Sequence, residues 1–286
     1  MNFSDNKTIS LNSQDGTLRN GTMLSNILFN TGCVLEEDKS IVDCHISVIN
    51  CQIPVSYYTI NDTNNTFQAK PFAGTYSTIT IPKGNYNQYD LQTALILALA
   101  AISTFSFTFN KATGILTWIA FANYSLNFVG YKGAAGILGF NQAVYNSVGT
   151  IVDGVYPLNL LGVKRISIKS YNLGITNFSS VGGDITLTTI PSDQPPFCML
   201  SYINQNPDDK QLVNVKTINS IDILLLDEND NFLDFNNIPW TLTLMLEITR
   251  FKPSATSTFK DIVSNVPIED EKITDIEDEL SFLVGK

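Results

Sequence analysis

The chain has 286 residues, of which 44% are hydrophobic and only 15% are charged, against about 25% charged residues in ordinary domains. This composition excludes a chain that is disordered throughout, because disorder requires few hydrophobic residues and many charges. The formal net charge of −10 argues against a general nucleic-acid binder, which needs clustered lysine and arginine. No apolar run approaches the about 20 residues of a membrane span, and the polar start predicts no signal peptide.

Residues 1–24 are rich in Ser, Asn, Asp, Gly and Thr, and we interpret them as an N-terminal arm that becomes ordered on a partner. Strands are expected from residue 25 onward. In 41–49 every second residue is apolar, which is the period of a half-buried strand. These residues are Val42, Cys44, Ile46 and Val48. Pro54 is expected to break or bend a further strand over 55–60.

Residues 76–140 have the pattern of a small inserted β-α-β-β domain. A strand is predicted at 77–81, then a helix over 88–101 with Asn87 as its N-cap. Strands at 105–109 and 115–121 form a hairpin whose turn contains a glycine. Four glycines then recur at every third position, and we expect tight backbone packing there, because neither a dinucleotide fingerprint nor a P-loop is present. These are Gly130, Gly133, Gly136 and Gly139.

From 141 to 252 short strands alternate with clusters of turn residues. The clearest strand is 240–249, in which every second side chain from Trp240 is apolar. Together with 25–75, this part predicts one discontinuous jelly-roll domain. The predicted fold is mainly β: a single jelly-roll β-sandwich with an inserted small α+β domain and a flexible acidic C-terminal tail.

The last segment, 253–286, is interpreted as a linker followed by an acidic tail. Between Pro267 and Lys286 seven acidic residues stand against two basic ones. Four apolar residues there are spaced as one narrow helical stripe. They are Ile273, Ile276, Leu280 and Leu283. Three interpretations stay open for this stripe: docking on a partner protein, docking on the chain's own body, or disorder.

No residue pattern indicates catalysis, and we expect a protein that is not an enzyme and holds neither cofactor nor metal. The only histidine, His45, cannot supply the two histidines of a metal-dependent oxygenase, and its pairing with Asp43 is commonplace on strands. The sequence after Asp227 begins like a calcium loop, but Phe232 and Ile238 break the motif, so a polar turn is expected. We expect the four cysteines to be buried thiols. Tyrosines leave open a sugar-binding or protein-binding surface. They are Tyr57, Tyr58, Tyr76, Tyr86 and Tyr89.

Three stretches in order resemble a known family. The first is 79–86, reading ITIPKGNY, followed by the predicted helix; the second is the 105–121 hairpin followed by 136–140. The third runs from 225–229 through 233–237 to Trp240 and the last strand. Over about 25–251, the chain resembles the penton, or minor capsid, proteins of virophages such as mavirus, of polinton-like viruses and of related giant-virus vertex proteins.

The resemblance implies a structural capsid protein that forms homopentamers at the five-fold vertices of an icosahedral virion, beside a double-jelly-roll major capsid protein. It also implies a location in the virion capsid, assembly in the host-cell cytoplasm, and an outer face open to a host receptor or a fibre. A receptor- or glycan-binding β-sandwich module is the alternative, and a hydrolase on a β-sandwich is a third. No direct nucleic-acid site is expected.

Overall fold

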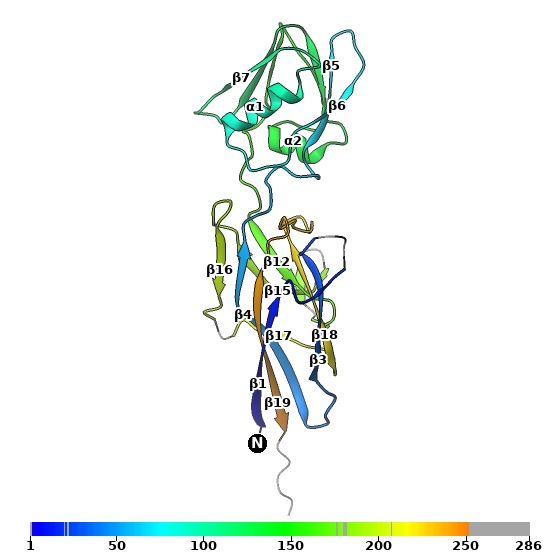
Figure 1. Ribbon diagram of the computed structural model, residues 1–286, viewed down its shortest axis with the longest axis vertical. Helices are drawn as coiled ribbons and strands as arrows, with labels where there is room; N and C mark the ends of the chain where they lie inside the picture. Colours follow the sequence, from blue (N-terminus) through cyan, green and yellow to red (C-terminus); the bar gives the residue numbers. More distant parts are fainter. Residues whose placement is uncertain are drawn as a thin grey trace, which may run out of the picture.

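The computed structural model describes residues 2–251 apart from 20, 22, 176, 180, 181 and 207. Two units lie one above the other along the long axis of the molecule (Figure 1). The lower unit contains both ends of the described chain, and the upper, distal unit is entered and left through two neighbouring segments. Within the described residues, no helix has the length and apolar character that crossing a bilayer needs.

The lower unit is a sandwich of two antiparallel sheets. The first sheet, the β1–β16 sheet, has the order β1 (Asn2–Asn12), β19 (Thr241–Phe251), β4 (Ile41–Pro54) and β16 (Met199–Ile203), with β17 (Gln211–Leu212) also pairing with β4. The second, the β2–β15 sheet, has the order β15 (Thr186–Pro191), β12 (Arg165–Lys169), β18 (Ile218–Leu226), β3 (Asn26–Leu35) and β2 (Thr17–Leu18). A short hairpin joins β13 (Asn177–Ser179) to β14 (Gly182–Asp184).

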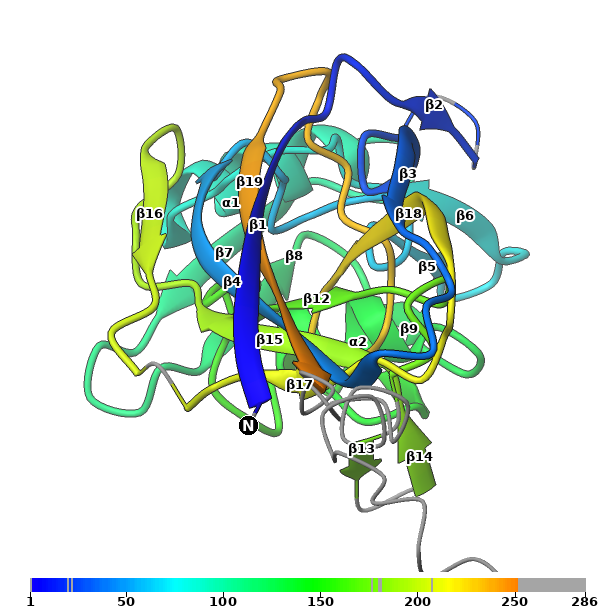
Figure 2. The ribbon, with the colours of Figure 1, turned by 90° about the horizontal axis from the view of Figure 1, so that it is seen from below.

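The strand order confirms the jelly-roll prediction. The eight main strands in chain order are β1, β3, β4, β12, β15, β16, β18 and β19. One sheet then holds the first, eighth, third and sixth, and the other holds the second, seventh, fourth and fifth, which is the connectivity of a jelly roll. Seen from below, β1 lies beside β19 in one sheet and β3 beside β18 in the other (Figure 2).

Alternating apolar residues of both sheets fill the space between them. On β19, Leu242, Leu244 and Leu246 are buried, as their period of two predicts. Trp240 closes the upper end of this core, where its indole nitrogen donates to the Leu24 carbonyl at 2.6 Å. The predicted inward residues of β4 are buried except Val42, which is 55% exposed near the lower end of the sandwich.

The N-terminal residues form a strand and not the expected arm. Strand β1 pairs with β19 along its whole length, and Ile9 and Leu11 face Leu244 and Leu242. Because an edge strand is held by main-chain hydrogen bonds and leaves most side chains in water, a polar sequence is compatible with it. A strand over 55–60 is likewise absent from the described fold: β4 continues to Pro54 and pairs there with Met199, and Val55 then bonds to the Cys198 carbonyl.

The distal unit contains two small sheets and two helices. One sheet has the order β10 (Val144–Asn146), β9 (Tyr124–Asn127), β5 (Thr66–Pro71) and β6 (Ser77–Thr80). The other has the order β11 (Ile151–Asp153), β8 (Leu116–Ala120) and β7 (Phe105–Phe109). The helices are α1 (Gln88–Ala98) and α2 (Lys132–Leu138). Trp118 lies at the centre of their shared core, edge-on to Phe67, Phe107 and Phe140.

The distal unit is wider in sequence than the predicted 76–140. Its buried cluster extends from Ile60 to Val152, with Leu158 and Leu160 packed against it. Residues 66–71 were assigned to the jelly roll, but they form β5, which pairs with β6 and β9 and therefore belongs to the distal sheets. The insertion thus lies between β4 and β12, the third and fourth strands of the jelly roll.

The helices show one correct and one missed prediction. The Asn87 side chain caps α1, because its Oδ1 accepts from the backbone N–H groups of Tyr89 and Asp90 at 2.8 and 3.0 Å. Helix α2 was not predicted, since two glycines within seven residues argue against a helix. Gly133 is required by packing: a Cβ there would lie 2.5 Å from the Thr63 carbonyl oxygen.

The cysteines divide into two pairs. Cys44 and Cys51 are buried, and burial raises the pKa of Cys51 to about 12 and that of Cys44 to about 11. Cys33 and Cys198 are exposed, so the expectation of four buried thiols is wrong for these two. The two buried thiols remain protonated at neutral pH and serve as small core residues.

Candidate functional site

The outer side of the β1–β16 sheet carries a broad patch without charged side chains. Residues that pair across neighbouring strands form rows across this sheet. One row runs from Asn12 through Thr241 and Gln52 to Ser201. The next row runs from Ser10 through Thr243 and Asn50 to Ile203. We call this patch the uncharged face. Its members are Thr8, Ser10, Asn12, Ser47, Asn50, Gln52, Met199, Ser201, Ile203, Thr241, Thr243 and Met245.

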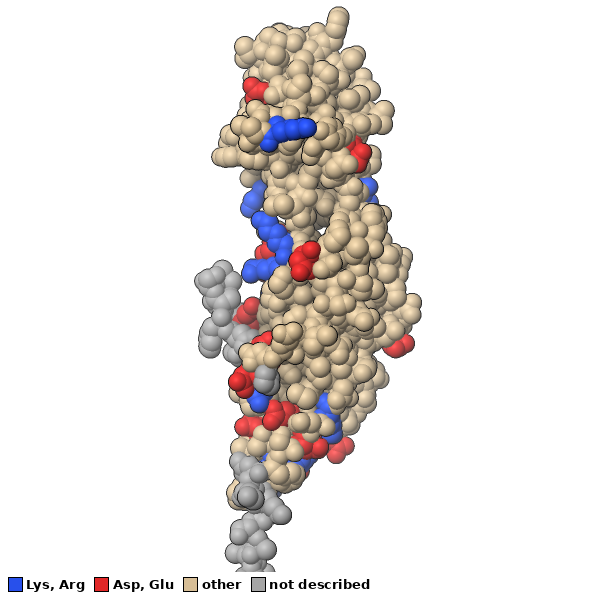
Figure 3. Space-filling view, turned by 90° about the vertical axis from the view of Figure 1, so that its left-hand side faces the viewer, with Lys and Arg blue, Asp and Glu red and all other residues tan. Residues whose placement is uncertain are grey.

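Charges begin only one row below the uncharged face. There Glu247 accepts from the Lys210 ammonium at 2.8 Å and from the Ser4 hydroxyl at 3.1 Å. These two hydrogen bonds hold the pKa of Glu247 below its usual value. Viewed from the side that bears β16, charged side chains gather at the lower end, at the neck and along one margin, and most of the remaining surface has none (Figure 3).

The outer side of the β2–β15 sheet has the opposite character, because ion pairs hold its loops in place. The Lys169 ammonium lies 2.9 Å from Asp230 and 3.2 Å from Asp184. Arg19 lies 3.6 Å from Asp222, which is completely buried. The two sides of the sandwich therefore differ: one carries the uncharged face, and the other has loops that are held by ion pairs.

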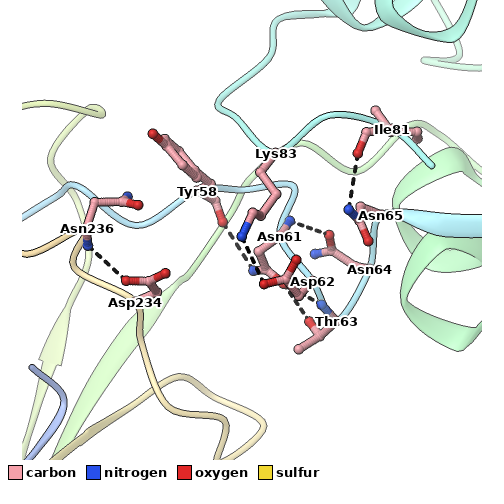
Figure 4. Close-up of polar contacts among 10 residues, drawn as sticks. All are labelled: Tyr58, Asn61, Asp62, Thr63, Asn64, Asn65, Ile81, Lys83, Asp234 and Asn236. Carbon is pink, nitrogen blue, oxygen red and sulfur yellow. Dashed lines mark hydrogen bonds and ion pairs between the residues drawn. The ribbon is translucent and has the colours of Figure 1, made fainter. Parts of the chain in front are cut away.

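A network of asparagines forms the neck between the units (Figure 4). The backbone N–H of Asn61 donates to the Asn64 side chain at 2.8 Å, and the Asn61 side chain donates to the Tyr58 carbonyl at 3.2 Å. On the distal side, Lys83 lies 3.0 Å from Asp62, and this hydrogen bond raises the Lys83 pKa. These side-chain amides hold the backbone of residues 58–64 in one conformation, in the first of the two segments that connect the units.

The residues that could carry chemistry do not assemble into a reactive site. His45 lies on the outer side of β4, with its Nδ1 3.8 Å from Asp43. The Asp227 carboxylate accepts from the backbone N–H groups of Asn229 and Asn231 at 2.8 and 2.9 Å, which is the polar turn that was expected. In the part of the chain that the structure describes, no three His, Cys, Asp or Glu side chains gather as a metal site would require.

The tyrosines that left open a sugar-binding surface are dispersed. Tyr57 is buried in the jelly-roll core and shares a hydrogen bond with Ser192. Tyr86 packs on the distal core, and its hydroxyl donates to the Pro82 carbonyl at 2.8 Å. Tyr89 is exposed on α1. The structure therefore does not bring them together into one aromatic platform.

The four residues of the predicted docking stripe, Ile273, Ile276, Leu280 and Leu283, lie outside the described residues. Strand β19 ends at Phe251, which pairs with Asn2 at the lower end of the molecule (Figure 1). The segment that bears the stripe is therefore attached at the end opposite to the distal unit.

Comparison with known proteins was made at the levels of sequence and structure. No protein-family profile matches the sequence, and no curated protein matches it. A crystal structure of the mavirus penton protein is similar with a TM-score of 0.45 and 12% identity, covering 87% of this chain and 99% of that one. A chain of the cryo-EM structure of the Sputnik virophage is similar with a TM-score of 0.40 and 15% identity, covering 86% and 98%. Over most of its length, the chain is thus similar to solved proteins of two virophages.

Proposed function

We propose that this chain is a structural capsid protein whose copies assemble into a homopentamer at the five-fold vertices of an icosahedral virion. The observation that supports this proposal most directly is the uncharged face on a jelly roll. Removing a large flat surface from water costs least when the surface carries no charges, because each buried charge requires a partner. The two unlike faces of the sandwich suit a closed ring, in which one face of each copy meets a different face of the next.

The apolar residues at the β16 edge add to this surface. Met199 and Ile203 are 48% and 68% exposed on the outer side of β16, and Phe197 just before the strand is 78% exposed. Apolar side chains beside uncharged polar ones are the composition of the buried centre of subunit interfaces. A ring that covers this edge would also pair or shield the free side of β16.

Charges placed in the uncharged face are expected to abolish the ring without unfolding the chain. Asn50 and Ser201 are both exposed, so the double variant Asn50→Lys/Ser201→Lys should change the monomer's stability by no more than about 0.5 kcal/mol per site. In a ring the two ammonium groups would be buried without partners, which costs several kcal/mol per contact. Native mass spectrometry should show wild-type particles of five times the 31.6 kDa chain and a monomeric variant.

The control for this experiment is Ala112→Lys, which adds one positive charge. Ala112 is exposed in the β7–β8 turn of the distal unit, so this variant adds positive charge away from the uncharged face. It should assemble like the wild type. A wild type that stays monomeric at high concentration would refute the pentamer, whereas a double variant that still forms rings would refute the contact through the uncharged face.

We propose that the acidic tail docks on a neighbouring capsid protein through its four apolar residues. The tail is attached at the end opposite to the distal unit, so a ring whose distal units point outward would direct it toward the shell. Replacing Ile273, Ile276, Leu280 and Leu283 by serine should leave ring formation unchanged and reduce binding to the major capsid protein by at least about tenfold. The wild type and the four-serine variant are compared in a pull-down with the purified major capsid protein. Equal binding by both would contradict this assignment.

A further inference from the structure

Three apolar side chains project from the end of the distal unit that is far from the jelly roll. Phe72 is 70% exposed, Phe121 89% and Val148 85%, and these are among the most exposed apolar residues of the described chain. Each lies in a different loop: Phe72 after β5, Phe121 after β8 and Val148 after β10. These loops lie at the upper end of the molecule, opposite to the termini of the described chain (Figure 1).

The three loops are tied together at Asn123 and Tyr124. The Phe72 N–H donates to the Asn123 carbonyl at 3.0 Å, and the Thr150 N–H donates to the Asn123 side chain at 3.1 Å. The Ser147 N–H donates to the Tyr124 carbonyl at 3.0 Å. These hydrogen bonds hold the loops that bear Phe72, Phe121 and Val148 beside one another. We call these three residues the apolar tip.

The three loops that carry the apolar tip contain no carboxylates. The loops 72–76, 121–123 and 147–150 hold no charged residue at all. The charged residue closest in sequence is Lys70, whose ammonium lies 4.9 Å from the centre of the Tyr76 ring. The absence of acidic groups in these loops removes the repulsion that an anionic surface would otherwise impose on approach.

We propose that the apolar tip inserts into the outer layer of a lipid bilayer. A stable protein interface requires about 800 Å² from each partner, whereas two phenylalanines at about 150–250 Å² each and one valine supply less. Bilayer insertion has no such minimum, because hydrocarbon chains adapt to any apolar protrusion and gain its buried area directly. The tip is also made of protruding loops and presents side chains outward, which suits a fluid layer.

The strength of binding would depend on how many tips act together. A single tip buries little area, so one chain should bind reversibly and weakly. If the chain forms the ring that we propose above, five tips on one particle would bind far more tightly through their effective concentration. Membrane binding by the chain itself does not require the ring, so the two proposals can fail separately.

Vesicle flotation tests the proposal directly. The full-length protein is mixed with phosphatidylcholine vesicles at millimolar lipid, with and without phosphatidylserine, and the fraction that floats is measured. The triple variant Phe72→Ser/Phe121→Ser/Val148→Ser should bind at least about tenfold less than the wild type. The control triple Leu161→Ser/Leu97→Ser/Val42→Ser, whose sites are 77%, 73% and 55% exposed outside the tip, should bind like the wild type.

A second measurement keeps the test valid if the triple variant folds poorly. Phe121→Trp places a reporter in the tip, while Trp118 and Trp240 stay buried and give a constant background. The emission of this variant should shift to the blue when vesicles are added. A wild type that does not float, a triple variant that floats equally, or a Phe121→Trp variant whose emission does not shift would each overturn the proposal. If the wild type does not float and the triple variant no longer self-associates, the tip would instead be assigned to contacts between copies of the chain.

Discussion

Replacing Asp222 by alanine is expected to lower the free energy of unfolding by about 2–4 kcal/mol. This carboxylate is fully buried on β18 and accepts from the Ser170 hydroxyl and the Asn172 N–H, both at 2.8 Å. It also accepts from the Tyr171 N–H at 3.3 Å and lies 3.6 Å from Arg19. Removing it leaves these donors without their acceptor, which costs more than the loss of one ordinary hydrogen bond. Urea unfolding followed by Trp240 fluorescence in a Trp118→Phe background, in which Trp240 is the remaining tryptophan, measures the change.

Two further variants distinguish the effect of losing the buried hydrogen bonds of Asp222 from the effect of removing a negative charge. Asp222→Asn keeps one oxygen as an acceptor, so the free energy of unfolding of this variant should lie between those of the wild type and Asp222→Ala. Asp62→Ala removes a carboxylate that is 73% exposed and pairs with Lys83, and it should cost no more than about 1 kcal/mol. If Asp222→Ala costs no more than Asp62→Ala, the network around Asp222 is not what holds the 170–172 loop.

Strand β18 shows which features of a strand the alternation of apolar residues in its sequence predicts, and which it does not. The inward positions of Ile221, Ile223 and Leu225 follow from the period of two, and all three are buried. The same period places Asp222 on the other side of the strand, but the complete burial of Asp222 is not visible in the sequence. The groups that cover it come from Arg19 and from 170–172, each about 50 or more positions away in the chain.

Errors in the prediction have physical causes of the same kind. Strand β1 was read as an arm because its side chains are mostly solvated, while its pairing with β19 depends on main-chain groups that every sequence has. Strand β5 was assigned to the wrong unit because a strand's own pattern does not specify its partner. The strands at Phe105–Phe109 and Thr241–Phe251 were predicted well, since each has a strong apolar pattern of its own.

The candidate interaction surfaces were predictable only in general terms. A low charge content indicates that uncharged surface exists, but its gathering on one side of one sheet follows from the register of β1, β19, β4 and β16. The apolar tip gave no periodic signal, because its three members lie in three turns. Phe121 was assigned to the end of a strand, and only the arrangement of the loops around Asn123 brings it to Phe72 and Val148.

Two of the glycines that recur at every third position, Gly136 and Gly139, differ in the space that a side chain would have. Gly139 ends α2 with a φ of +77°, and a Cβ there would lie 2.3 Å from the Tyr156 carbonyl oxygen. Its own carbonyl accepts from the N–H groups of Val155 and Tyr156 at 2.8 and 2.9 Å, where the chain begins to leave the distal unit. Gly139→Ala is therefore expected to destabilise the distal unit by about 2–4 kcal/mol, from left-handed backbone strain together with overpacking.

Gly136 is the matched control, because it lies three residues earlier in the same helix and a Cβ there would meet nothing within 4 Å. Gly136→Ala should stabilise the distal unit by about 0.5–1 kcal/mol, since alanine loses less backbone freedom in a helix. In a Trp240→Phe background the remaining tryptophan is Trp118, so its emission during urea unfolding reports the distal core alone. The urea midpoints of Gly139→Ala and Gly136→Ala are expected to shift in opposite directions. Equal shifts would show that the close approach of residue 139 to the Tyr156 carbonyl oxygen does not require glycine.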